Sequence, residues 1–166
     1  MNRSIAALLF VALCTLLACG PPPRPRAPTD ADLRTIDEGR ALSLIADTLL
    51  ESGVRGESGW TVAIASEVNL PVDIRIPGRD FGIEWVSPQD RHDFGDAIPD
   101  PVSGQLRLAP GYGDDASAQI LILDFVSYRY DPDRQRVQYG APSIRDAESR
   151  LQRDVQDFLR HIDHQN

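Results

Sequence analysis

The order in which apolar spacings follow one another constrains the fold of this chain of 166 residues more than any other feature. Apolar side chains recur at helical spacing over 29–52 and over 143–162, and they alternate with polar ones over much of 60–86. The segment 118–130 is apolar on both faces, which is typical of a central strand. Along the sequence, the predicted strands therefore lie between two long predicted helices and do not alternate with helices. We therefore expect an α+β fold with an antiparallel sheet of about five or six strands, flanked by an N-terminal and a C-terminal helix.

Short polar motifs predict where several elements begin. The segments 29–32 and 143–146 each pair a hydroxyl residue with an aspartate three positions later, which predicts a capped helix start. Residues 70–86 alternate on both sides of a Pro-Gly-Arg-Asp turn and predict a hairpin. The segment 87–94 begins with Ser-Pro-Gln-Asp, which indicates one or two helical turns. A short strand is expected at 106–108.

A second hairpin is predicted at 128–139, where Asp-Pro-Asp-Arg at 131–134 forms the turn and 137–139 forms the return strand. Tyrosine and arginine gather there, and both are enriched in protein interfaces. The predicted partner-binding residues are Tyr128, Arg129, Tyr130, Arg134, Arg136 and Tyr139. Stacking on a glycan and ordinary cross-strand packing are the alternative interpretations of this edge.

The first residues are expected to carry an export signal rather than part of the fold. Residues 5–18 hold no charge, and a helix of that length spans about 21 Å, shorter than the roughly 30 Å hydrocarbon core of a membrane. The run ends in Leu16-Leu17-Ala18-Cys19, which resembles the lipobox of bacterial lipoproteins. The resemblance implies that Cys19 is acylated and that the signal is cleaved before it. An ordinary secretory signal that contains Cys19 by chance is the alternative.

The resemblance divides the chain into a signal peptide at 1–18, a lipidated cysteine with a proline-rich tether at 19–28, and a single α+β domain at 29–166. It implies a place in the outer membrane, facing the periplasm or displayed outside, because Gly20 rather than an aspartate follows the cysteine. Several acyl chains together anchor a protein stably. The prolines of the tether predict an extended spacer of roughly 25 Å.

Two reactive side chains are missing from the expected mature chain, and this excludes several chemistries. Cys14 leaves with the signal and Cys19 carries lipid, so no thiol remains for a nucleophile, a redox pair or a cysteine zinc site. All 17 basic residues are arginine, which excludes reactions that need lysine, such as Schiff-base chemistry. The net charge of −8, with no basic block, argues against nucleic acid as a partner.

No motif indicates a metal, a cofactor or serine catalysis. The sequence contains neither Gly-x-Ser-x-Gly nor Gly-x-Gly-x-x-Gly. Potential metal ligands gather in four places, but helix caps and turns explain them without a metal. These are Asp90, His92, Asp93 and Asp96; Asp114 and Asp115; Asp131 and Asp133; and His161 and His164. We expect no cofactor and no metal site.

Asp124 interrupts the apolar run of 118–130, so one of its sides is expected to be buried. A buried carboxylate needs an arginine, backbone donors or a raised pKa. Arg75 and Arg129 are the predicted partners of a structural ion pair. With Glu84 as a second acid, Asp124 would instead belong to an acid pair of the kind that hydrolases use.

The sequence favours a non-catalytic binding or assembly role over an enzyme. The expected protein is an outer-membrane lipoprotein that contacts the membrane through its lipid and an envelope protein through its folded domain. One alternative is a hydrolase of envelope polymers that uses Asp124 and Glu84. The other is a binder of a small apolar ligand between sheet and helices.

Overall fold

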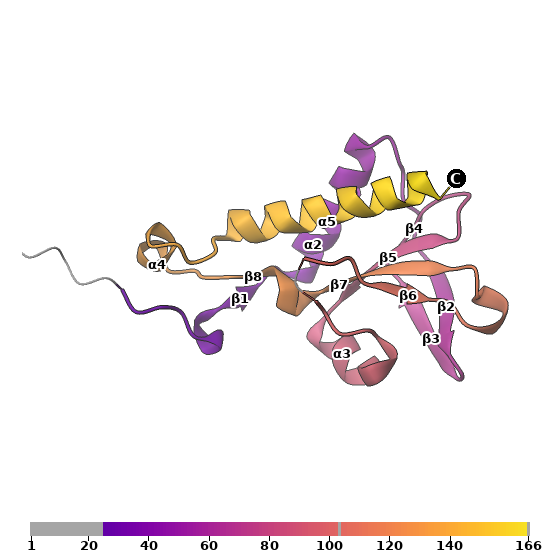
Figure 1. Ribbon diagram of the computed structural model, residues 1–166, viewed down its shortest axis with the longest axis horizontal. Coiled ribbons are helices and arrows are strands. Elements are labelled where there is room, and N and C mark those ends of the chain that lie inside the picture. Colours follow the sequence, from indigo (N-terminus) through magenta and orange to yellow (C-terminus); the bar gives the residue numbers. More distant parts are fainter. Residues whose placement is uncertain (1–24, 103, 166) are drawn as a thin grey trace, which may run out of the picture.

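The computed structural model describes residues 25–102 and 104–165 (Figure 1). The predicted signal peptide, Cys19 and the first part of the predicted tether lie outside these residues. Within the described residues, no helix is both long enough and apolar enough to cross a membrane.

Four strands form the central sheet, in the order β4 (Ile74–Arg75), β5 (Phe81–Val86), β7 (Gln119–Asp124) and β6 (Leu108–Pro110). β5 and β7 run parallel along their whole length, and each outer strand is antiparallel to its neighbour. The chain between β5 and β7 forms the short helix α3 (Pro88–Phe94) and then β6. This connection is long enough to bring β7 back in the direction of β5.

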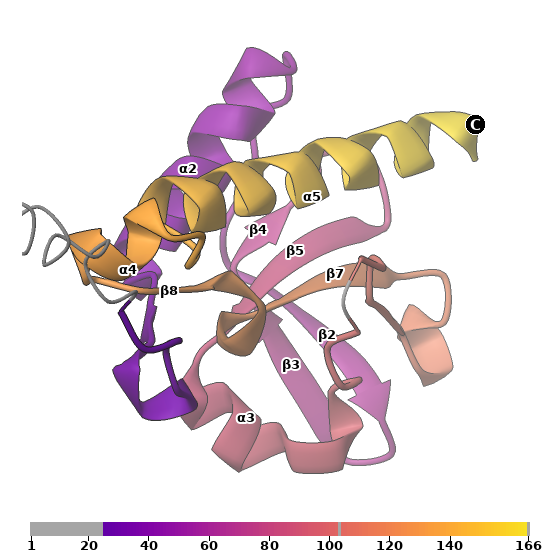
Figure 2. The ribbon, with the colours of Figure 1, turned by 60° about the vertical axis from the view of Figure 1, so that its left-hand side comes forward.

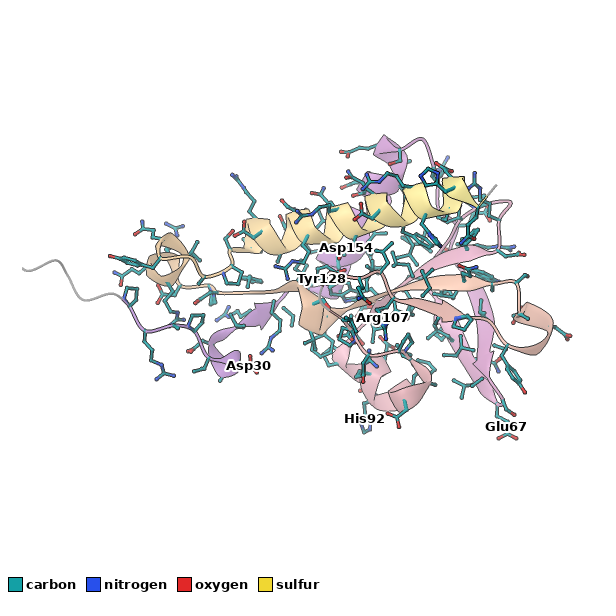
Figure 3. The ribbon with its side chains drawn as sticks, in the orientation of Figure 1. Asp30, Glu67, His92, Arg107, Tyr128 and Asp154 are labelled. Carbon is teal, nitrogen blue, oxygen red and sulfur yellow. The ribbon has the colours of Figure 1, made fainter. Side chains whose placement is uncertain are left out.

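Two antiparallel pairs stand beside the central sheet. β2 (Trp60–Ala65) and β3 (Val68–Val72) form a hairpin with Glu67 at its tip, in the left-handed region at φ 67° (Figure 3). β1 (Arg34–Thr35) pairs with β8 (Arg129–Tyr130), so segments far apart in sequence lie side by side.

The α+β class is confirmed, but a single antiparallel sheet of five or six strands does not form. The alternating segment 70–76 was expected to be one strand, whereas the chain leaves β3 at Asp73 and enters β4 in a different sheet. The central pair is parallel because α3 and β6 lie between β5 and β7, where a tight turn would have made the pair antiparallel.

The two long helices, α2 (Glu38–Glu51) and α5 (Ile144–His164), pack against each other beside the central sheet (Figure 2). α5 begins where the sequence predicts, because Ser143 and Asp146 form a complete capping box. The Ser143 N–H donates to the Asp146 carboxylate at 2.8 Å.

The first helix begins later than the sequence predicts. The capping box of Thr29 and Asp32 is present, but it opens only the 3-10 turn η1 (Asp30–Asp32). The chain then extends to form β1, and α2 starts at Glu38 with the Asp37 side chain as its cap. Pairing of β1 with β8 thus takes the place of the first predicted helical turns.

The predicted hairpin at 128–139 does not form. The strand predicted at 118–130 ends at Asp124, and the chain turns into η4 (Phe125–Tyr128) before β8. The expected return strand is instead the short helix α4 (Arg134–Gln138). The Asp133 carboxylate accepts the Gln135 N–H at 2.8 Å and caps this helix, and β8 finds its partner in β1.

The short helix α3 forms as predicted at 87–94. Its capping box is complete, with the Ser87 N–H donating to the Asp90 carboxylate at 2.9 Å. The turns η2 (Gly95–Ala97) and η3 (Gly113–Asp115) complete the connections around β6. The Asp115 carboxylate accepts the Ala63 N–H at 2.8 Å and holds η3 against β2.

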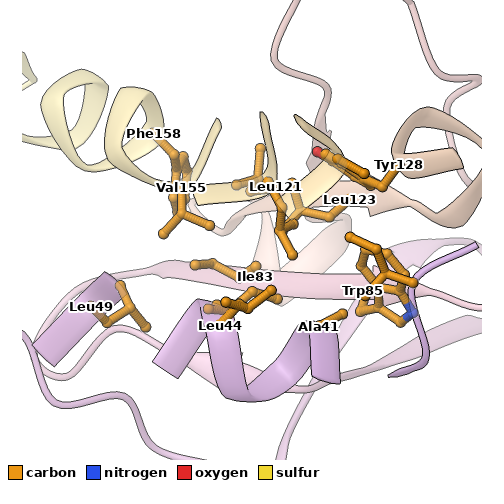
Figure 4. Close-up of a cluster of buried hydrophobic side chains, with 14 of the residues drawn as sticks. Ala41, Leu44, Leu49, Ile83, Trp85, Leu121, Leu123, Tyr128, Val155 and Phe158 are labelled. Atoms are coloured by element: carbon orange, nitrogen blue, oxygen red, sulfur yellow. The ribbon is translucent and has the colours of Figure 1, made fainter. Parts of the chain in front are cut away.

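Two hydrophobic clusters pack against the two faces of the central sheet. Alternate residues of β7 enter different clusters, as the two-residue period of a strand requires. Leu121 and Leu123 pack with α2 and α5 (Figure 4), whereas Ile120 and Ile122 pack with the β2–β3 hairpin. The run that is apolar on both faces is therefore an internal strand, and its end at Asp124 marks the edge of the core.

Candidate functional site

The six residues predicted to bind a partner do not share one surface. Tyr128 is buried, packs its ring against Trp85 and donates its hydroxyl to Asp154 at 2.7 Å. Burial and the neighbouring Asp154 charge raise the pKa of Tyr128 above its ordinary value, so the hydroxyl remains a donor. Tyr130 is half-buried against the same core, and Tyr139 is 54% exposed.

The arginines of this set have separate surroundings. Arg129 donates to the Asp30 carbonyl at 2.7 Å and lies 3.4 Å from its carboxylate. Arg136 forms two hydrogen bonds to the buried Asp131 carboxylate, at 2.6 and 3.0 Å, which lower the pKa of Asp131. Arg134 is exposed at the start of α4. The intramolecular partners of Arg129 and Arg136 indicate structural roles.

Asp124 is buried, as the sequence predicts, and its partner is Arg91. The Arg91 guanidinium donates two hydrogen bonds to one Asp124 oxygen, from Nε at 3.0 Å and from Nη2. The other oxygen accepts the Val126 N–H at 2.9 Å and caps η4. This structural ion pair uses an arginine of α3 rather than the predicted Arg75 or Arg129.

Glu84 is also buried, but its acidic neighbour is Asp73 rather than Asp124. The parallel register sets Glu84 beside Ile122 and Asp124 beside Val86. We call Asp73 and Glu84 the acid pair. The Asp73 carboxylate accepts the Trp85 N–H at 2.8 Å, and the Glu84 carboxyl group accepts the Asp73 N–H at 3.0 Å.

These bonds explain why two acids lie where β3 gives way to β4. At Asp73 the chain leaves one sheet and enters another, so the backbone lacks regular ladder partners there. Each carboxyl group supplies an acceptor to an amide of the neighbouring segment. The acid pair therefore joins the two sheets at this junction.

Burial and the neighbouring Asp73 charge raise the pKa of Glu84 to about 9. Burial also raises the pKa of Asp73, against the opposing effect of the Trp85 N–H. Both shifts favour the protonated forms of these two groups. They line a cleft of about 370 Å³ with Trp60, Glu38 and Asp90, so a protonated and an ionisable acid face one open space.

A larger groove, of about 650 Å³, lies between α5 and the segment that leads into β6. Its floor is the second half of β7, and η4 closes one end. Figure 3 shows Arg107, Tyr128 and Asp154 around this groove, below α5. We call it the arginine groove and define it by Gln105, Leu106, Arg107, Val126, Arg150 and Arg153.

Arg91, Arg129 and Arg136 have carboxylate partners, and the arginines of the groove differ from them. Arg107 donates to the Asp100 carbonyl at 2.9 Å, and Arg150 donates to the Ser127 carbonyl at 3.0 Å. Among the described residues, neither these two nor Arg153 forms an ion pair with a carboxylate. Asp154 also lines the groove, but it accepts the Tyr128 hydroxyl. Sequence analysis missed this set because it comes from two distant segments.

The residues considered as metal ligands have other roles: Asp131 is buried and binds Arg136, and several others serve as caps or surface groups. Asp90 completes the cap of α3, Asp93 accepts the Gln89 amide at 2.8 and 2.9 Å, and His161 contacts Gln165 at 2.8 Å. Over residues 25–102 and 104–165, no three His, Cys, Asp or Glu side chains gather in a way that would hold a metal ion.

Comparison with known proteins adds no relative. The chain matches no family model, no curated protein and no solved structure. The geometry of the acid pair and of the arginine groove is therefore the basis for any functional proposal.

Proposed function

We propose that this chain is a lipoprotein of the outer membrane whose folded domain has a non-catalytic binding or assembly role in an envelope complex. Cys19 is the proposed lipid anchor and the proline-rich segment after it the proposed spacer. The domain would face the periplasm or the exterior, and its partner would be an envelope protein rather than nucleic acid.

The observation that carries this proposal is the arginine groove. It is an open concave surface with exposed Val126 and Gln105 at its rim and the floor of β7 beneath. Binding sites are concave and combine polar with apolar groups, and the groove combines arginines with Leu106 and Val126. Arg91 and Arg136, by contrast, are engaged with carboxylates of the fold.

Site-specific photo-crosslinking in native membranes tests the binding role. A photoreactive residue at Gln105 or Val126 is expected to give one discrete adduct with an envelope protein. The same residue at Glu67, on the tip of the β2–β3 hairpin, is the matched control and is expected to give none (Figure 3). Equal adducts at all three positions, or none, would overturn the proposal.

The anchor is tested separately by Cys19→Ala. This variant is expected to lose incorporated fatty acid and to move from the membrane to the soluble fraction. If the variant keeps its fatty acid and its membrane association, the lipid anchor at Cys19 is wrong.

The acid pair favours a second candidate, a hydrolase of envelope polymers. A protonated Glu84 beside an ionisable Asp73 in a cleft with Trp60 is an arrangement suited to acid–base chemistry. Asp124 does not belong to this acid pair, because it forms an ion pair with Arg91. The purified chain is assayed for release of soluble fragments from isolated peptidoglycan. Activity that Glu84→Gln abolishes and Glu67→Gln preserves would establish this candidate, and absence of fragment release would reject it for that polymer.

A further inference from the structure

Three arginines line the arginine groove without forming an ion pair among the described residues, and they outnumber Asp154 and Asp157, the two acids that also line it. The protein has a net charge of −8, so most of its surface repels anions. Arg150 and Arg153 project from exposed positions of α5 and Arg107 lies on the facing wall, half-buried. Within the described residues, Arg107 and Arg150 donate to neutral backbone carbonyls, those of Asp100 and Ser127. The guanidinium groups thus retain donors for an anionic ligand.

Apolar side chains lie between these arginines. Leu106 is half-buried and Val126 is 43% exposed. The paired register of β6 and β7 ends at Leu108 and Leu121, and the Ile122 N–H donates to the Arg107 carbonyl at 2.8 Å just beyond it. Residues 121–123 of β7 line the groove. The groove therefore has arginines on both walls and apolar side chains between them.

We infer that the arginine groove binds an extended acidic segment of the partner protein, in which carboxylate side chains alternate with apolar ones; this inference rests on the proposed function. Arg107 on one wall and Arg150 and Arg153 on the other pair with carboxylates, and Leu106 and Val126 contact the apolar residues. An extended chain supplies both kinds of side chain, because its successive side chains point to opposite sides.

The charge pattern favours a peptide over an anionic membrane. Asp154 and Asp157 also line the groove on α5, close to its arginines. A uniformly negative surface would meet these aspartates as well as the arginines, and like charges brought together reduce affinity. A peptide with carboxylates at defined positions can pair them with the arginines and keep them away from the aspartates.

Two synthetic peptides test the inference against the full lipidated chain in a non-ionic detergent. One alternates glutamate with valine and the other alternates glutamine with valine. The glutamate peptide is expected to bind at least about tenfold more tightly, and its affinity is expected to fall as salt is raised. Equal binding of both peptides, or binding of neither, would overturn the inference.

Variants of the chain test whether the glutamate peptide binds at the arginine groove. Combined Arg107→Gln, Arg150→Gln and Arg153→Gln is expected to weaken binding of the glutamate peptide by about tenfold or more. Arg145→Gln is the matched control, because Arg145 is an exposed arginine of α5 that does not line the groove. A similar loss with Arg145→Gln would overturn the assignment to the groove. Unchanged melting temperatures exclude misfolding as the cause.

Charge reversal gives a result that loss of stability cannot produce. Combined Arg150→Glu and Arg153→Glu is expected to reject the glutamate peptide and to bind a peptide that alternates arginine with valine. The last experiment measures binding of the chain to vesicles that contain anionic phospholipid. Arginine-dependent binding to vesicles without binding to the glutamate peptide would overturn the inference in favour of lipid. The crosslinking at Gln105 and Val126 distinguishes failure of this inference from failure of the proposed function. If adducts form there but the peptide tests fail, the groove binds a partner that is not an acidic segment.

Discussion

The acid pair and the arginine groove both bring ionisable side chains together beside the central sheet, but they differ in their bonding partners. Asp73 and Glu84 lie where β4 begins, and each accepts a backbone N–H of the neighbouring segment. The groove lies beside β6, at the other edge of the sheet, and its arginines have no carboxylate partner among the described residues.

This difference shows that a strongly shifted pKa does not by itself identify a binding site. The pKa of Glu84 is raised to about 9, yet the bonds of its carboxyl group are explained by the change of sheet at Asp73. Perturbed groups cluster at functional sites, but structural networks perturb them too. Donors left without charged partners in an open groove are the better indication of a ligand.

The largest expected effect is a pH dependence of stability that belongs to Glu84. Its pKa is raised on folding, so the folded state holds a proton that the unfolded chain has already released at neutral pH. This group's contribution to stability is fully present below the ordinary glutamate pKa and is lost as the pH rises to about 9, with a slope of up to about 1.4 kcal/mol per pH unit.

Glu84→Gln is expected to remove that slope. Glutamine cannot ionise and keeps an acceptor for the Asp73 N–H, so its unfolding free energy would stay higher than that of the natural chain as the pH rises. Denaturant unfolding at a series of pH values measures this, with Glu67→Gln as the control. Parallel curves for Glu84→Gln and the natural chain would show that Glu84 ionises normally in the fold.

The next largest effect concerns the Arg91–Asp124 ion pair. Asp124→Ala removes a buried carboxylate that binds both Arg91 and the Val126 N–H, so it is expected to lower the unfolding free energy by about 3 kcal/mol. The Asp124 side chain is 2% exposed, whereas Asp100, which lies 3.7 Å from the same arginine, is 93% exposed.

Asp100→Ala is therefore the matched control, and its expected effect is below about 0.5 kcal/mol. Chemical denaturation of the two variants gives the comparison directly. Equal losses would mean that Arg91 draws no more stability from its buried partner than from its exposed one.

A smaller effect is expected where the groove meets the core. Tyr128→Phe removes the hydrogen bond to Asp154 but keeps the ring that packs against Trp85. The expected loss of stability is about 1 kcal/mol, the net contribution of one hydrogen bond. Tyr139→Phe, at an exposed position, should leave the unfolding free energy unchanged. A loss at Tyr139 as large as that at Tyr128 would contradict this account.

Local parts of the fold follow from the sequence, and pairings between distant segments do not. The capping boxes at Ser87 and Ser143 form as predicted because their hydrogen bonds join residues three positions apart. The capping box at Thr29 also forms, but pairing of β1 with β8 prevents it from opening a long helix. A long-range contact there overrides a correct local signal.

The candidate sites show the same limit. Alternation over 70–86 gives no sign that Asp73 is the place where the chain changes sheets, because Asp73 also fits the polar position of an ordinary strand. Asp124 was recognised as a buried acid from its apolar neighbours, but its partner depends on where α3 comes to lie. Arg107 lines the same groove as Arg150 and Arg153 only because β6, β7 and α5 pack together in the fold.

The smallest expected effect on stability completes the comparison, and it comes from the groove. Arg153 is exposed and forms no ion pair within the described part of the chain, so Arg153→Gln is expected to change the unfolding free energy by less than about 0.5 kcal/mol. Arg136→Gln, the same substitution at an arginine bound to buried Asp131, is expected to lose clearly more. Denaturant titration ranks the two. A large loss at Arg153 would place that arginine with the satisfied charges of the fold and remove it from the binding site.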